Sequence, residues 1–145
     1  MKIFDSLLPP LEGAFRVEIM QRVHNRFAVE VVLMPKVKLA RLAYSRSGDK
    51  GDGSNVGVVA YSPEIYAFLK RSLTADVVKK HFHEICKGEV DRYEADNLLA
   101  LNFILHDSLG GGGSESLKTD AQGKTHGLGM LQLELDVPAD LKLPG

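Results

Sequence analysis

The chain has 145 residues, a net charge of −1 at pH 7 and a pI of about 6.5, values typical of one globular domain. With this near-neutral net charge, the chain offers no strongly basic surface to bind the phosphate backbone of a nucleic acid. The single cysteine, Cys86, excludes an internal disulfide and a cysteine-based zinc site. No apolar run reaches the roughly 18 residues that span a bilayer, and we expect no signal peptide because Asp5 stands where its apolar run would begin. We therefore expect a cytoplasmic protein without nucleic-acid or membrane partners.

The N-terminal part predicts an arm followed by a β-hairpin. Prolines and a glycine interrupt residues 1–14. Residues 15–20 and 27–34 flank a short polar segment, and the second of these stretches is rich in β-branched side chains. Pro35 ends the predicted hairpin because proline cannot donate to a strand ladder.

Two strands and a polar loop are predicted next. Residues 37–44 have the composition of a strand, and residues 55–60 have that of a short buried strand. Between them, Ser45–Ser54 combines glycines with charged and hydroxyl side chains. This composition predicts a loop.

Residues 63–86 predict one broken helix or two short helices. Ser62 is a suitable N-terminal cap, and Pro63 suits the first helical position. Thr74 offers a second cap, and apolar residues follow it at helical spacing. Gly88 is a natural stop.

The C-terminal half predicts two more strands and one helix. Residues 89–94 have the composition of a strand, whereas the leucines of residues 97–109 recur at helical spacing. Gly110–Gly113 cannot continue a helix. Residues 131–137 alternate apolar and polar side chains, the pattern of a half-buried strand. Together these elements predict an α+β sandwich whose mostly antiparallel sheet carries helices on one face.

The first candidate site is the polar loop. Its glycines expose backbone amides, and Arg46 and Lys50 supply positive charge for a carboxylate or phosphate. Asp49 and Asp52 have three candidate roles: an acid or base, a group that orients the cations, or a ligand for a hard metal. The simpler interpretation is a polar hairpin loop whose charges pair with one another.

The second candidate site is the four-glycine segment Gly110–Gly113, which permits very close approach of a ligand or of a neighbouring chain. A flexible linker is the simpler interpretation. Asp120 is a third acid that, with Asp49 and Asp52, offers oxygen ligands to a metal, but three loop acids are a weak signal. The histidines are scattered, and we assign no metal site.

Taken in order, these motifs resemble the C-terminal domain of the acyclic terpene utilisation (AtuA-like) family. The resemblance begins near Leu39 and covers about a hundred residues. The residues that carry it are Ser45–Asp52, Asn55–Val58, Arg92–Glu94, Asn97-Leu98, Ala100–Phe103, Gly110–Gly113, Ser116-Leu117 and Asp120–Lys124.

The resemblance implies a ferredoxin-like fold for residues 38–138, preceded by an extension over residues 1–37 and followed by a tail over residues 139–145. In this family the domain usually follows a much larger domain, in proteins associated with breakdown of acyclic terpenes through CoA thioesters. The resemblance therefore implies that this chain is either a small subunit that pairs with a large AtuA-like subunit or a homo-oligomer.

The favoured hypothesis is an accessory enzyme subunit that binds an anionic group, such as that of an acyl-CoA, where the two glycine segments meet. No cofactor is expected. The alternative is a non-catalytic assembly module that packs against a larger partner or itself. The predicted ligand-binding residues are Arg46, Ser47, Gly48, Lys50, Gly51, Asn55, Asn102, Gly111, Gly112, Gly113, Ser114, Gln122 and Lys124, with Asp49 and Asp52 as catalytic candidates.

Overall fold

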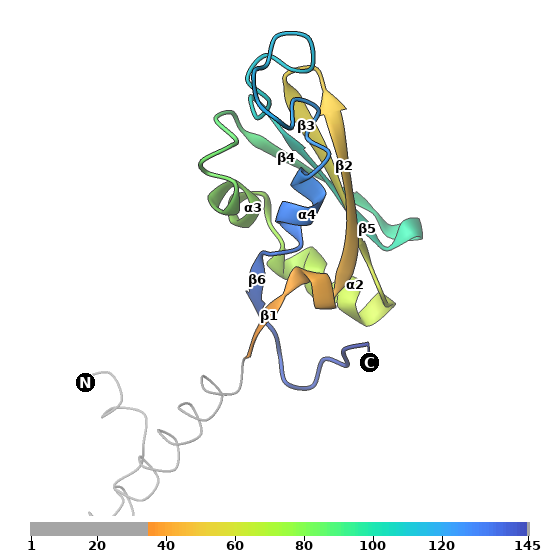
Figure 1. Cartoon of the computed structure of the whole chain (residues 1–145). Coiled ribbons are helices and arrows are strands. Elements are labelled where there is room, and N and C mark those ends of the chain that lie inside the picture. Colours follow the sequence, from red (N-terminus) through yellow and green to blue (C-terminus); the bar gives the residue numbers. More distant parts are fainter. Residues whose placement is uncertain (1–34, 145) are drawn as a thin grey trace, which may run out of the picture. The chain divides into compact units, whose positions relative to one another are not determined.

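The computed structural model describes residues 35–144 (Figure 1). The hairpin predicted at residues 15–34 lies outside these residues. No helix among those described is long and apolar enough to cross a membrane. In chain order the elements are β1 (Lys36–Lys38), the 3-10 helix η1 (Leu39–Arg41), β2 (Ala43–Lys50), β3 (Gly53–Ala60), α2 (Pro63–Ser72), α3 (Ala75–His81), β4 (Val90–Ala95), the 3-10 helix η2 (Asp96–Leu98), β5 (Ala100–Leu105), α4 (His126–Met130) and β6 (Glu134–Asp136).

The main sheet has the strand order β2-β3-β5-β4, and all neighbouring strands are antiparallel. The chain leaves β3, passes through α2 and α3, and returns in β4, while β5 fills the place between β3 and β4. This split β-α-β unit is the ferredoxin-like arrangement. The edge strand β2 precedes it in the chain, and β1 and β6 form a separate antiparallel pair. The predicted α+β class, antiparallel sheet and ferredoxin-like fold are confirmed.

Side-chain alternation gives the sheet a buried side and an exposed side. Val56 and Val58 of β3 lie opposite Phe103 and Leu101 of β5, and all four are at most 1% exposed. They pack with apolar residues of the helices into one core. Figure 1 shows α3 and α4 on this same side of the sheet. Within residues 35–144, no helix covers the other side, which we call the open face.

The two predicted helix caps are present. The Ser62 hydroxyl accepts a hydrogen bond from the Ile65 amide at 3.2 Å, and Thr74 accepts one from the Val77 amide at 3.3 Å. The region therefore forms two short helices, α2 and α3, as the sequence predicts. Both caps act within one helical turn, which is why local sequence identifies them.

Two predictions near the first glycine segment are wrong. The strand predicted at residues 37–44 is interrupted by η1, so that its halves belong to different sheets. The predicted loop Ser45–Ser54 is a regular β-hairpin, and only Gly51 and Asp52 form the turn. The main-chain ladder to β3 holds these polar residues in strand geometry despite their loop-like composition.

The prediction of a helix at residues 97–109 is also wrong, because residues 100–105 form the strand β5. Leu101, Phe103 and Leu105 alternate with half-buried residues, and this two-residue period places them in the core. The strand predicted at residues 131–137 is shorter, since β6 covers only Glu134–Asp136. The helix α4 before it has no cap hydrogen bond from a side chain and was not predicted.

Candidate functional site

The register of the sheet defines the open face as a grid of side chains. One row across all four strands consists of Arg46, Gly57, Asn102 and Tyr93. The neighbouring rows are Tyr44, Val59, Ala100 and Ala95 on one side, and Gly48, Asn55, Ile104 and Asp91 on the other. Since directly opposite residues share a face, these side chains project from one surface.

Two glycines leave a bare patch of backbone on this grid. A Cβ atom at Gly57 would meet only the Arg46 carbonyl oxygen at 3.8 Å and the Asn102 Oδ1 atom at 3.9 Å, both ordinary contacts. A Cβ at Gly48 would meet only the end of the Lys124 side chain at 3.4 Å. By contrast, a Cβ at Gly53 would lie 2.9 Å from the Leu105 carbonyl oxygen. The fold therefore requires Gly53, but it does not require Gly57 or Gly48.

Three cations border the bare patch. Arg46 and Lys50 project from β2 on either side of Gly48, with about 7 Å between successive same-face positions. The Lys124 ammonium group lies next to Gly48, 3.4 Å from where a Cβ atom of that residue would be. Within residues 35–144, no carboxylate forms an ion pair with Arg46, Lys50 or Lys124. Three cationic side chains therefore gather around the bare patch.

Internal hydrogen bonds fix the backbone that carries Lys124. The Asp120 carboxylate accepts the amide hydrogens of Lys124 and Thr125, each at 2.8 Å, and the Thr125 hydroxyl hydrogen at 2.6 Å. Burial alone would raise the pKa of Asp120, but these donors hold the pKa below its ordinary value. Ser47 donates to the Lys124 carbonyl oxygen at 3.0 Å and accepts the Gly127 amide at 2.7 Å. Ser47 therefore anchors the loop from the other side of β2.

Two asparagines occupy the centre of the open face. The Asn55 side-chain amide donates to the Asn102 Oδ1 atom at 2.6 Å, and both residues are half-buried. This bond leaves the Asn102 NH₂ group and the Asn55 carbonyl oxygen for a ligand. The site thus combines cations, amide donors and bare backbone.

The two glycine segments meet at one end of the sheet. Asp52 accepts the Gly111 amide at 2.5 Å, and a Cβ at Gly112 would lie 2.5 Å from the Gly51 carbonyl oxygen. Gly110, Gly111 and Gly112 all have positive φ, between 65° and 100°. The four-glycine segment is therefore folded tightly against the hairpin turn, and Asp52 already occupies the amide of Gly111.

The predicted site residues therefore separate into two groups. Those of the open face are Arg46, Gly48, Lys50, Asn55, Asn102 and Lys124. Those at the tip or inside the fold are Ser47, Gly51, Asp52, Gly111, Gly112, Gly113, Ser114 and Gln122. Asp49 alternates with Lys50 along β2 and points away from the open face. Among the described residues, no three metal-ligating side chains gather, because Asp52 and Asp120 hold separate loops.

A buried polar network was missed by sequence reasoning. Ser54 lies 3.0 Å from the Ser108 hydroxyl and 2.8 Å from His126 Nδ1, and Ser108 donates to the Leu105 carbonyl oxygen. Burial lowers the pKa of His126. Ser54 is fully buried, so it is not accessible as a nucleophile, and the network instead joins three chain segments. Since 72 positions separate Ser54 from His126, sequence spacing gives no signal for it.

The remaining histidines and the cysteine act locally. His106, predicted on the polar side of a helix, lies in the turn after β5 and contacts the Asp91 carboxylate at 2.8 Å. His81 contacts the Gly129 carbonyl oxygen at 2.8 Å. Cys86 is buried, and burial raises the pKa of its thiol despite Lys79, whose ammonium group lies 4.0 Å from the sulfur. This environment does not activate a thiol.

Comparison with known families gives one match, which covers residues 37–136 and is described as the AtuA ferredoxin-like domain. The chain belongs to this family. Both glycine segments, the open face and the buried network lie inside the matched region of the AtuA ferredoxin-like domain. Searches of curated proteins and of solved structures found no significant match.

Proposed function

We propose that this AtuA ferredoxin-like domain is an accessory module that binds the anionic group of a small ligand on its open face. The observation that carries the proposal is the pair Gly48 and Gly57. Glycine in a strand interior weakens a sheet, and it often marks a position where a ligand approaches the backbone. Nothing among the described residues requires either glycine, and the bare patch lies between cations and amide donors.

The chemistry of the border matches a carboxylate or phosphate. Arg46 supplies a fork of N–H donors, and Lys50 and Lys124 add point charges. The Asn102 amide supplies a neutral donor in the same row as Arg46. We infer that an acyl-CoA, with anionic phosphates and an acyl thioester, is the ligand class, in support of acyl-CoA breakdown by an AtuA-like protein.

Calorimetric titration of the purified chain with CoA and short acyl-CoA thioesters tests this proposal. We expect binding that weakens about tenfold or more in Arg46→Ala, because charge-assisted hydrogen bonds contribute about 1.5–3 kcal/mol. Gly57→Val fills the bare patch with a good strand former and should abolish binding without unfolding the chain. Arg71→Ala, which removes an exposed cation of α2, is the matched control. Equal affinities in all four proteins would refute the proposal.

A second candidate function is an assembly module, and the exposed aromatic residues of the same face favour it. Tyr44 and Tyr93 are 50% and 54% exposed and lie in adjacent rows on opposite edges of the sheet. Tyrosine and arginine are enriched where protein surfaces meet. In this case a larger subunit or a second copy covers the open face, and Arg46→Ala lowers the apparent mass in light scattering instead of the ligand affinity.

A further inference from the structure

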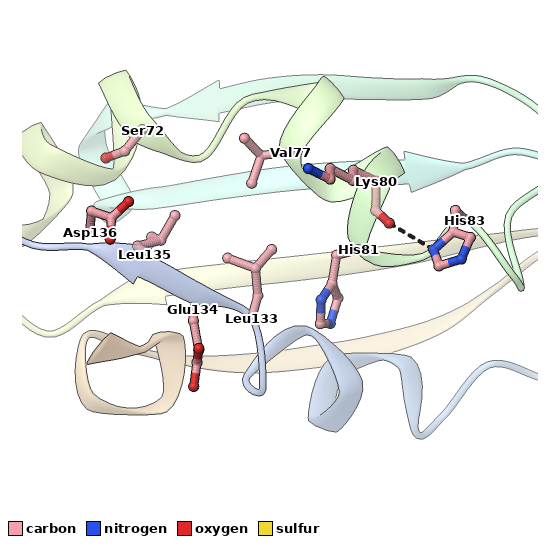
Figure 2. Close-up of a pocket in the computed structure, with 9 residues that line it drawn as sticks. All are labelled: Ser72, Val77, Lys80, His81, His83, Leu133, Glu134, Leu135 and Asp136. Atoms are coloured by element: carbon pink, nitrogen blue, oxygen red, sulfur yellow. Dashed lines mark hydrogen bonds between the residues drawn. The ribbon is translucent and has the colours of Figure 1, made fainter. Parts of the chain in front are cut away.

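A groove separate from the open face lies between α3 and β6 (Figure 2). Its volume is about 630 Å³. Val77, Leu133 and Leu135 give it an apolar lining, and Figure 2 shows these side chains in the space between helix and strand. Lys80, His81 and His83 line the groove from α3 and the turn after it, and Glu134 and Asp136 line it from the strand.

The strand β6 presents an open edge to this groove. Its other edge pairs with β1, in the register Lys38↔Glu134, Val37↔Leu135 and Lys36↔Asp136. The Leu39 amide donates to the Leu133 carbonyl oxygen at 2.8 Å, which shows which opposite residues of this antiparallel pair are hydrogen-bonded to each other. Because hydrogen-bonded and non-hydrogen-bonded pairs alternate, Val37 and Leu135, two residues along, exchange both of their backbone hydrogen bonds.

The backbone groups of Glu134 and Asp136 consequently point away from β1. Within residues 35–144, neither residue has a backbone hydrogen bond with any segment on that side. Two N–H donors and two C=O acceptors thus lie on the edge of β6 that does not pair with β1, beside the apolar side chains of the groove. This arrangement is the one that accepts an added strand, because the main chain supplies the hydrogen bonds and the groove receives alternate side chains.

The pairing of β1 with β6 indicates which side chains such a strand carries. Lys36 lies opposite Asp136, with 4.0 Å between Nζ and Oδ1, and Lys38 lies opposite Glu134. The apolar Val37 between them packs against the core. The acidic residues of β6 thus face a cation–apolar–cation triplet, and opposite charges at directly paired positions stabilise a strand pair.

We propose that this groove binds an extended peptide segment with the pattern cation–apolar–cation, which adds as a strand to the free edge of β6. The peptide's cations lie beside the Glu134 and Asp136 carboxylates, and its central apolar residue contacts Leu135. On the opposite wall, the Lys80 ammonium group can donate to carbonyl oxygens on the outer edge of the peptide. The occupant is therefore a basic, extended segment of a partner protein.

The test is a titration of the ¹⁵N-labelled full chain with a six-residue peptide that copies residues 35–40, a sequence already shown to suit β6. We expect slower hydrogen exchange and shifted signals at the Glu134 and Asp136 amides, and little change at Leu135, whose amide is already bonded. Replacement of both peptide lysines by glutamate leaves the protein unchanged and should weaken binding about tenfold.

Three outcomes overturn the proposal. One is the absence of any shift at about 1 mM peptide, the weak end of specific binding. Another is protection of the Lys36 or Lys38 amides, which places the peptide on the outer edge of β1. The third is protection of Glu134 and Asp136 before peptide is added, together with a doubled mass, which assigns the groove to a second copy of the chain.

Discussion

Two glycine-to-alanine substitutions test whether folding requires glycine at the bare patch of the open face. Gly57→Ala adds a methyl group that meets nothing closer than 3.8 Å. Gly112→Ala adds one that lies 2.5 Å from the Gly51 carbonyl oxygen, at a φ of 78° that L-residues rarely adopt. The two variants make the same chemical change, but the structure gives them opposite consequences.

We expect Gly57→Ala to raise the free energy of unfolding by about 0.4–1 kcal/mol, because the unfolded chain loses conformational freedom. Gly112→Ala should lower it by more than about 1–2 kcal/mol, the cost of the left-handed backbone alone. The melting temperatures should therefore differ by about 5 °C or more. Thermal unfolding followed by circular dichroism measures both. A Gly57→Ala variant as unstable as Gly112→Ala would refute the view that the fold does not require Gly57.

Three further substitutions test individual side-chain contacts. Burial lowers the pKa of His126, so near and below the ordinary value of 6.5 the unfolded state binds more protons than the folded state. The free energy of unfolding should therefore be highest above that pH and fall as the pH drops below it. In urea titrations at several pH values, His126→Gln should make the free energy of unfolding depend less on pH. Arg92→Lys should lower the free energy of unfolding by about 2 kcal/mol, because it loses bonds to the carbonyl oxygens of Leu73 and Lys70 near the end of α2; an unchanged urea midpoint would contradict that role. Asp52→Ala should cost about 1 kcal/mol and speed amide exchange at Gly111, whereas unaltered exchange would show that the carboxylate does not hold the loop.

Elements fixed by local interactions could be predicted from the sequence. The caps at Ser62 and Thr74 act on amides three residues away, and both helices form where expected. The strand at residues 89–94 also forms, as β4. The class of fold followed from this mixture of elements, and the family resemblance supplied the ferredoxin-like arrangement.

Where the secondary structure depends on pairing with segments distant in the sequence, the sequence alone could not predict it. Leu101 and Leu105 are four residues apart. This spacing places them on the same face of a helix and equally on the same face of a strand. The pairing of β5 with β3 and β4 selects the strand. Similarly, the polar residues around Gly48 join a strand because β3 supplies the ladder.

The candidate site shows the same division. Its cations and glycines are recognisable as residue types, but their side of the sheet depends on register. Alternation places Arg46 and Lys50 on the open face, whereas Asp49 projects to the other side and Ser47 becomes an internal anchor. Lys124 reaches Gly48 only because α4 packs on β2, a contact between segments 76 positions apart or more.

The most direct test of anion binding on the open face is chemical-shift mapping of the ¹⁵N-labelled chain with CoA. We expect the largest shifts on the backbone amides of Gly48 and Gly57 and on the side-chain amides of Asn55 and Asn102. Shifts at Gly111 should be small, because its amide is already bonded to Asp52. Shifts confined to the four-glycine segment, or no shifts at saturating CoA, would contradict anion binding on the open face.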